Sequence, residues 1–110
     1  MEIKEIQKND VTIIEIIGRL DTSNYNQLES KINELLEKGH IRLLVDCSQM
    51  DYVSSSGLRI FLVGLKKIIS IKGKFALCGL QENIREIFEI SGFNSIFSIY
   101  PNLDEALSSF

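Results

Sequence analysis

The sequence contains 110 residues, of which 45% are hydrophobic and 25% are charged, so we expect a single domain over residues 1–110. Its 12 basic and 15 acidic side chains give a net charge of −3, which argues against nucleic-acid binding and against electrostatic attachment to a membrane. No apolar run reaches the roughly 18–20 residues that cross a bilayer, and the first residues lack the apolar region of a signal peptide. We therefore expect a cytoplasmic protein.

Two strands are predicted near the N-terminus. The segment Val11–Ile17 is rich in β-branched residues, and Ile3–Ile6 has a weaker strand pattern. The polar residues Lys8–Asp10 between them favour a hairpin turn. This pair is expected to form an antiparallel edge of the sheet.

The first helix is predicted from apolar residues that recur at steps of three and four and therefore share one face. These residues are Tyr25, Leu28, Ile32, Leu35 and Leu36. Thr22 or Ser23 is expected to cap the helix, because a hydroxyl can accept a hydrogen bond from a free backbone N–H of the first turn. Lys38 and Gly39 are typical of a helix C-terminus.

The rest of the chain alternates strands with helices. Further strands are predicted at Ile41–Val45, Phe75–Cys78 and Ile96–Tyr100, and Asp46–Val53 is predicted to be a loop. Further helices are predicted at about Ser56–Ile71 and Glu82–Ile90, with a short terminal helix capped by Asn102. The order ββαβαβαβα predicts an α/β fold: a mostly parallel five-stranded sheet with one antiparallel edge and about four helices.

The cysteines and the histidine do not suggest catalysis or metal binding. Cys47 and Cys78 each lie in an apolar, strand-like stretch, so we expect both to be reduced packing residues. His40 is the only histidine and is predicted to be a solvated loop residue. A zinc site needs about four ligands, and triad chemistry needs a positioned histidine. We therefore expect neither a metal site nor catalytic residues.

Three serines and a glycine precede the second helix, within the segment Asp51–Arg59. One interpretation is helix capping, for which a single hydroxyl suffices. The other is phosphorylation of one serine, because the free N–H groups and partial positive charge of a helix N-terminus stabilise a phosphate by about 0.3–1 kcal/mol. Gly57 would allow another protein to approach closely, and Arg59, four residues after Ser55, could reach a phosphate there.

The segment Ser54–Arg59 resembles the phosphorylation motif of the bacterial anti-sigma factor antagonists, which are STAS domains. The family has approximately Asp-Ser-(Ser/Thr/Ala)-Gly-Leu-Gly at this place. Gly18–Asp21 resembles the family's turn after the second strand, Cys78–Leu80 its loop after the fourth strand, and Glu89–Phe93 the end of its third helix. These matches occur in order and at the expected spacing over nearly the whole chain, so the resemblance implies a single STAS domain.

The resemblance implies a partner switch that needs neither catalytic groups nor a cofactor. In this family, the unphosphorylated antagonist binds an anti-sigma factor that is also a serine kinase, and this frees the sigma factor. The kinase then phosphorylates the antagonist and weakens binding, and a PP2C-type phosphatase reverses the modification. A monomer that forms heteromers is expected. The family register implies Ser55 as the acceptor, with a partner surface or phosphate environment formed by Asp21, Ser54, Ser56, Gly57, Leu58 and Arg59.

The sequence departs from the family motif at two positions. Ser54 stands where the family has an acidic residue, and Arg59 stands where it has a second glycine. Losing the acid removes a negative charge beside the phosphate, and Arg59 adds a counter-charge. Both changes should make phosphoserine easier to accommodate, and both alter the surface that a kinase meets.

Two other classes of protein remain as alternatives. A response-regulator receiver would use Asp46 at the end of a central strand, but it also needs an acidic pair and a lysine that this sequence lacks at the expected strand ends. A STAS scaffold, in a signalling assembly or a lipid transporter, would use the serines only as helix caps. The hydroxyl of Ser55 favours the switch, and the missing acid at Ser54 favours the scaffold.

Overall fold

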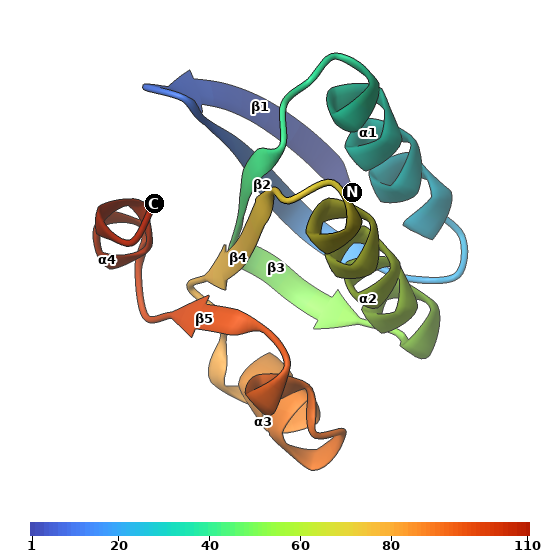
Figure 1. Cartoon of the computed structure of the whole chain (residues 1–110). Coiled ribbons are helices and arrows are strands. Elements are labelled where there is room, and N and C mark those ends of the chain that lie inside the picture. Colours follow the sequence, from blue (N-terminus) through green and yellow to red (C-terminus); the bar gives the residue numbers. More distant parts are fainter.

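Five strands form one mixed sheet in the order β1-β2-β3-β4-β5 (Figure 1). The computed structural model describes all 110 residues, and its strands are Glu2–Lys8 (β1), Val11–Leu20 (β2), Arg42–Val53 (β3), Lys74–Cys78 (β4) and Ser98–Tyr100 (β5). β1 and β2 are antiparallel, and every later pair is parallel. The predicted α/β fold, with one antiparallel edge on a parallel sheet, is confirmed.

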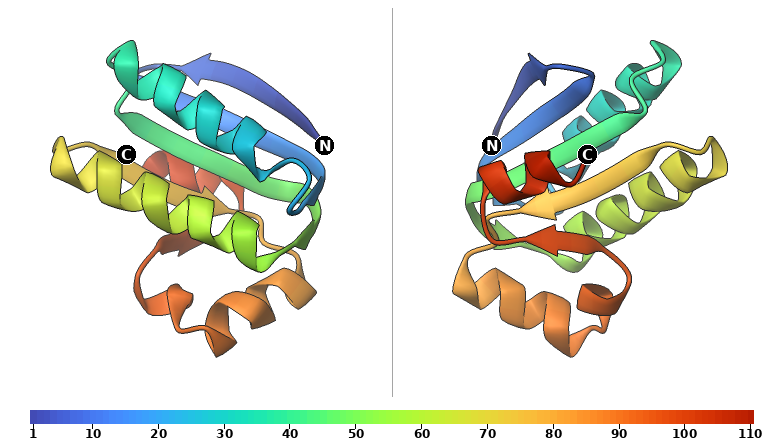
Figure 2. Two further views of the ribbon diagram at one scale, coloured as in Figure 1. Left: turned by 90° about the vertical axis from the view of Figure 1, so that its right-hand side faces the viewer. Right: turned by 60° about the vertical axis from the view of Figure 1, so that its left-hand side comes forward.

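Three helices pack against the main core on one side of the sheet and a fourth packs on the other side, an arrangement that can be followed in Figure 2. They are Tyr25–Glu37 (α1), Ser55–Ser70 (α2), Glu82–Ile90 (α3) and Leu103–Ser108 (α4), with a 3-10 turn at Phe93–Ser95 (η1). A core of 20 buried residues lies between the sheet and α1, α2 and α3, and a second cluster of six lies under α4. None of the helices has the length and apolar character needed to cross a membrane.

β3 is much longer than predicted, and the predicted loop at Asp46–Val53 is wrong. The strand continues to Val53, and its buried residues Cys47, Met50 and Val53 alternate unevenly with exposed ones. The pairing of β2 with β3 contains two register shifts, which break the regular period of two. Backbone pairing with the equally extended β2 therefore holds this polar stretch in the sheet.

β2 ends at Leu20, three residues later than predicted, and the remaining boundaries differ by at most two residues. α2 begins and ends one residue earlier than predicted. The last strand begins at Ser98 instead of Ile96, because η1 occupies the residues just before. The predicted cap of α4 is confirmed, since the Asn102 side chain accepts a hydrogen bond from the backbone N–H of Glu105 at 2.9 Å.

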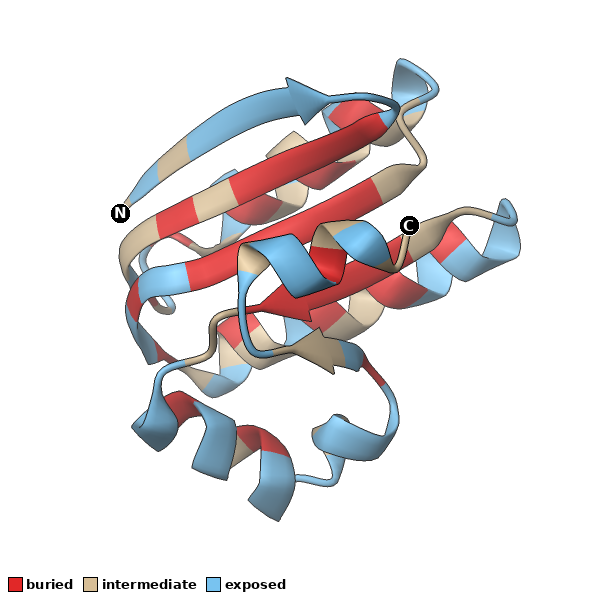
Figure 3. Cartoon of the chain, turned by 90° about the vertical axis from the view of Figure 1, so that its left-hand side faces the viewer, coloured by how far each residue is buried: buried red, intermediate tan, exposed pale blue.

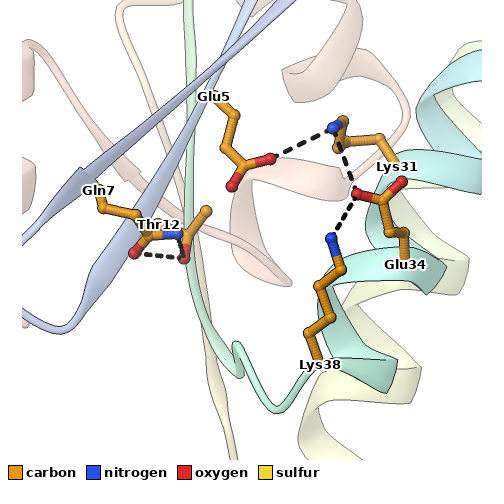
Figure 4. A network of polar contacts seen from close by, with 6 residues as sticks. All are labelled: Glu5, Gln7, Thr12, Lys31, Glu34 and Lys38. Carbon is orange, nitrogen blue, oxygen red and sulfur yellow. Dashed lines mark hydrogen bonds and ion pairs between the residues drawn. The ribbon is translucent and has the colours of Figure 1, made fainter.

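The outer strand β1 is almost entirely exposed, in contrast to the buried central strands (Figure 3). An ion-pair network connects it to α1 (Figure 4), because the Lys31 ammonium lies 3.2 Å from the Glu5 carboxylate and 3.6 Å from that of Glu34. Its hydrogen bond with Glu5 raises the pKa of Lys31, against the desolvation that lowers it. Charged residues along such an edge oppose unwanted pairing with another sheet.

Both cysteines are buried free thiols that face opposite sides of the sheet, as expected for reduced packing residues. Cys47 belongs to the core under α1–α3, and Cys78 belongs to the cluster under α4. Burial, and to a smaller extent the nearby Asp46 carboxylate, raises the pKa of Cys78 to about 12. Burial also raises the pKa of Cys47 far above its usual value. The thiolate is the reactive form, so both side chains should be inert in the folded protein.

We therefore predict that neither cysteine reacts with Ellman's reagent in the folded protein at mildly alkaline pH. Both should react within the mixing time once the chain is unfolded in guanidinium chloride. Absorbance of the released thionitrobenzoate measures the reaction. Fast reaction of one thiol equivalent without denaturant would contradict the burial described here.

Candidate functional site

The end of β2 and the start of α2 are joined by a backbone hydrogen bond. The N–H of Ser54 donates to the carbonyl of Leu20 at 2.9 Å, directly beyond the last register pair of β2 and β3, Leu20 with Val53. The turn that contains Asp21 therefore lies beside the first turn of α2. The sheet thus brings together the two segments Gly18–Asp21 and Ser54–Arg59, which lie far apart in the sequence.

Ser54 is the N-cap of α2, so one of the three serines has the capping role that the sequence suggested. Its backbone is extended, and its hydroxyl oxygen accepts a hydrogen bond from the N–H of Gly57 at 3.2 Å. Ser55 is the first residue of the helix and is exposed, whereas Ser56 is partly buried. The structure shows no hydrogen bond for the Ser55 hydroxyl. Ser54 thus caps the helix, whereas the hydroxyl of the neighbouring Ser55 has no hydrogen-bond partner.

The start of α2 is electrostatically suited to an anion. Its first turn contains no acidic residue, and its 16 residues place a partial positive charge at this end. Arg59 is exposed and lies four residues after Ser55, so the two side chains share one face of the helix. No acidic side chain forms an ion pair with Arg59. Its guanidinium is therefore available to a negative group at Ser55.

Gly57 faces the interior, so the expectation that it lets another protein approach is wrong. A Cβ atom at this position would lie 2.8 Å from Cγ of Leu20 and 3.0 Å from Cγ2 of Val53. The glycine therefore allows the first turn of α2 to pack against the ends of β2 and β3. The next residue, Leu58, is partly buried and packs against the main core. Gly57 is therefore buried, and the Leu58 side chain is only partly accessible to a partner.

Asp21 is held within its own turn. Its carboxylate accepts hydrogen bonds from the backbone N–H of Ser23 at 3.0 Å and from its hydroxyl at 2.6 Å. These bonds lower the pKa of Asp21, and the neighbouring Arg19 adds to the effect. The structure thus shows Asp21 as a turn aspartate, and its place in a partner surface stays a prediction. The structure shows no hydrogen bond from Asp21 to the backbone near Ser55.

The predicted caps of α1, Thr22 and Ser23, are also wrong. Asn24 precedes the helix, and its side chain makes no capping bond to it. Its amide instead closes the turn, accepting from the N–H of Asp21 at 2.9 Å and donating to the carbonyl of Arg19 at 2.8 Å. The buried amide of Asn24 thus fixes the turn that leads from β2 into α1.

One feature of this surface was missed from the sequence. The guanidinium of Arg19 lies 4.0 Å from the ring centre of Tyr52, and both side chains are exposed. The two residues are register partners at the ends of β2 and β3. Treating Tyr52 as part of a loop hid this pairing. The signal that would have revealed it is the group of residues typical of strands, Met50, Tyr52 and Val53, within the presumed loop.

The features required by the enzymatic alternative are not seen. Asp46 is buried, and its carboxylate accepts a hydrogen bond from the backbone N–H of Ser48 at 3.0 Å. No three histidine, cysteine, aspartate or glutamate side chains lie close enough together to hold a metal ion.

The different roles of Ser54 and Ser55 can be tested by measuring the free energy of unfolding of alanine variants. We predict that Ser54→Ala lowers the free energy of unfolding by about 1 kcal/mol, because the N–H of Gly57 loses its capping partner. Ser55→Ala should change it by less than about 0.5 kcal/mol, as for an exposed residue outside any cap. Urea unfolding followed by circular dichroism measures both values. Equal losses in the two variants would show that the cap is wrongly assigned.

The family model described as the STAS domain matches residues 2–106 of the chain. A protein of Bordetella bronchiseptica, BtrV, whose name places it among the anti-sigma factor antagonists, is 38% identical over 93 residues, covering 84% of this chain and 80% of its own.

Two solved structures share the fold. One, from Thermotoga maritima and described as an anti-sigma factor antagonist, has a TM-score of 0.93 at 24% identity and covers 97% of this chain and 92% of its own. The other is the Bacillus cell fate determinant SpoIIAA in its phosphorylated form, with a TM-score of 0.78 at 18% identity and coverage of 98% of each chain. The chain therefore belongs to the STAS-domain family of anti-sigma factor antagonists, which are regulatory proteins and not enzymes.

Proposed function

We propose that this protein is a phosphorylation-controlled partner switch. In its unphosphorylated form it binds an anti-sigma factor that is also a serine kinase, and this binding releases the sigma factor. Phosphorylation of Ser55 weakens the complex, and a PP2C-type phosphatase restores the active form. The observation that carries the proposal is the position of Ser55: exposed, free of hydrogen bonds, and first in a helix anchored to the sheet.

The two neighbouring serines are poorer acceptors. The hydroxyl of Ser54 caps α2, so a phosphate there would compete with the bond to the N–H of Gly57. Ser56 is partly buried, and a kinase needs the hydroxyl to reach into its own active site. Ser55 has neither constraint. Its place agrees with the acceptor position that the family motif implies.

The physical basis of the switch is a local change of charge on a rigid surface. A phosphate adds about −1.5 to −2 charges at neutral pH. The partial charge of α2 and the guanidinium of Arg59 would hold it without unfolding the helix. The domain would therefore keep its shape while its partner meets a new negative charge. The related SpoIIAA has been solved in a phosphorylated form, which supports a folded phosphoprotein here.

The binding partner provides the direct test of this proposal. The anti-sigma factor would be identified by mass spectrometry after capture on the unphosphorylated chain, and its Kd measured by calorimetry. Phosphoserine introduced at position 55 should weaken binding by about tenfold or more, because the added negative charge must lose its hydration in the interface and alters the charge that the partner meets. Phosphoserine at Ser108, which is exposed on α4, is the matched control and should leave Kd unchanged. Equal affinity of the two phosphorylated forms would exclude the switch and favour a scaffold.

The role of Arg59 can be tested without any partner. In protein carrying phosphoserine at position 55, we predict that Arg59→Gln raises the second pKa of the phosphate, because the guanidinium stabilises the dianion. Arg85→Gln, at an exposed position of α3, is the matched control and should have no effect. Phosphorus NMR titration measures the pKa. Identical titration curves for wild type and Arg59→Gln would show that Arg59 does not contact the phosphate.

A further inference from the structure

The far end of α2 carries several positive charges that form no ion pair with an acidic side chain. Between Asp51 and Glu82 the sequence contains five basic residues and no acidic one. Three of them, Lys66, Lys67 and Lys72, are exposed at the end of α2 and in the turn to β4, and none forms an ion pair. The ammonium of Lys67 donates only to the neutral side-chain oxygen of Asn33, at 2.8 Å. The three lysines therefore form a local positive region on a protein whose net charge is negative.

Two exposed isoleucines lie among these lysines. Ile69 is 62% exposed and Ile71 is 44% exposed, which places both among the few large apolar side chains at the surface. Ile69 follows Lys66 by three residues and Ile71 follows Lys67 by four, so each pair shares a face at the end of the helix. We call these five residues the lysine tip: Lys66, Lys67, Ile69, Ile71 and Lys72. The end of α2 and its turn project beyond the sheet (Figures 2 and 3).

Lys72 occupies a backbone conformation that favours glycine. Its φ is 62°, in the left-handed region, where a side chain is disfavoured. The helix ends there with bonds from the N–H of Lys72 to the carbonyl of Ile69 at 3.0 Å and from the N–H of Gly73 to that of Ile68 at 2.8 Å. Glycine is the usual residue at such a position. The chain thus keeps a cation where the fold alone would favour glycine, which points to a role at the surface.

The adjacent glycine fixes the shape of the tip. A Cβ at Gly73 would lie 2.2 Å from the carbonyl oxygen of Ile41, so this turn is packed tightly against the start of β3. The lysines and isoleucines are therefore presented by a rigid support, which lowers the entropic cost of binding.

We propose that the lysine tip docks an acidic protein segment that contributes carboxylates to Lys66, Lys67 and Lys72 and an apolar side chain to Ile69. Charge complementarity selects the class of partner. A membrane fits less well, because three lysines are few for an anionic bilayer and the rest of the protein is acidic. The tip lies about 22 Å along α2 from Ser55, so docking there is independent of the proposed switch.

The probe is a synthetic acidic peptide of alternating glutamate and leucine residues, titrated into the isotopically labelled full chain and followed by amide NMR. We expect shifts confined to residues 66–73. Lys66→Glu with Lys67→Glu should weaken binding by about fivefold or more for each charge reversed, and Ile69→Ser should weaken it as well. Reversal of two lysines elsewhere, Lys4→Glu with Lys8→Glu on β1, is the matched control and should preserve it.

The variant Lys72→Gly distinguishes a loss of peptide binding from a loss of stability. We expect this variant to be more resistant to urea than wild type, because the left-handed strain is relieved, and yet to bind the peptide more weakly. Shifts spread over lysines throughout the chain, or unchanged binding by both Ile69→Ser and Lys72→Gly, would overturn the proposal. So would co-sedimentation with phosphatidylglycerol vesicles in the absence of peptide binding, which would assign the tip to a membrane.

Discussion

The hydrogen bond from the N–H of Ser54 to the carbonyl of Leu20 is the contact on which the arrangement of the surface depends. It anchors the start of α2 to the end of the central sheet, and Gly57 allows the helix to pack there without a side chain in between. Because β2 and β3 both extend to this point, their last residues and the first turn of α2 form one continuous rigid unit. A group attached to Ser55 is therefore held at a defined position on the molecule.

This rigidity suits a regulatory protein more than an enzyme. No group of side chains in the chain could hold a metal ion, and an exposed hydroxyl lies at the positive end of a helix. A charge added there would change the surface and not the fold, since capping depends on Ser54 and packing depends on Gly57. The separation of these three tasks among neighbouring residues would let the serine-rich segment serve both the fold and the proposed regulation.

The sequence was sufficient for the order and type of the elements, because strongly apolar segments such as Val11–Ile17 and the helix after Tyr25 have clear periods. Prediction from the sequence was wrong where strand pairing or side-chain hydrogen bonds determine the local structure. The polar end of β3 is a strand only because β2 lies beside it, and Asn24 replaces the expected caps because its amide bridges Arg19 and Asp21. The inward direction of Gly57 and the stack of Arg19 on Tyr52 likewise require the folded chain.

Peptide mass spectrometry of the protein purified from its native cells tests most directly whether Ser55 carries a phosphate in the cell. We expect a single phosphoryl group on Ser55 in the wild-type protein, and none in Ser55→Ala. A phosphate confined to Ser54 or Ser56 would contradict the assignment of cap and acceptor. An unmodified protein under all growth conditions would contradict the switch itself.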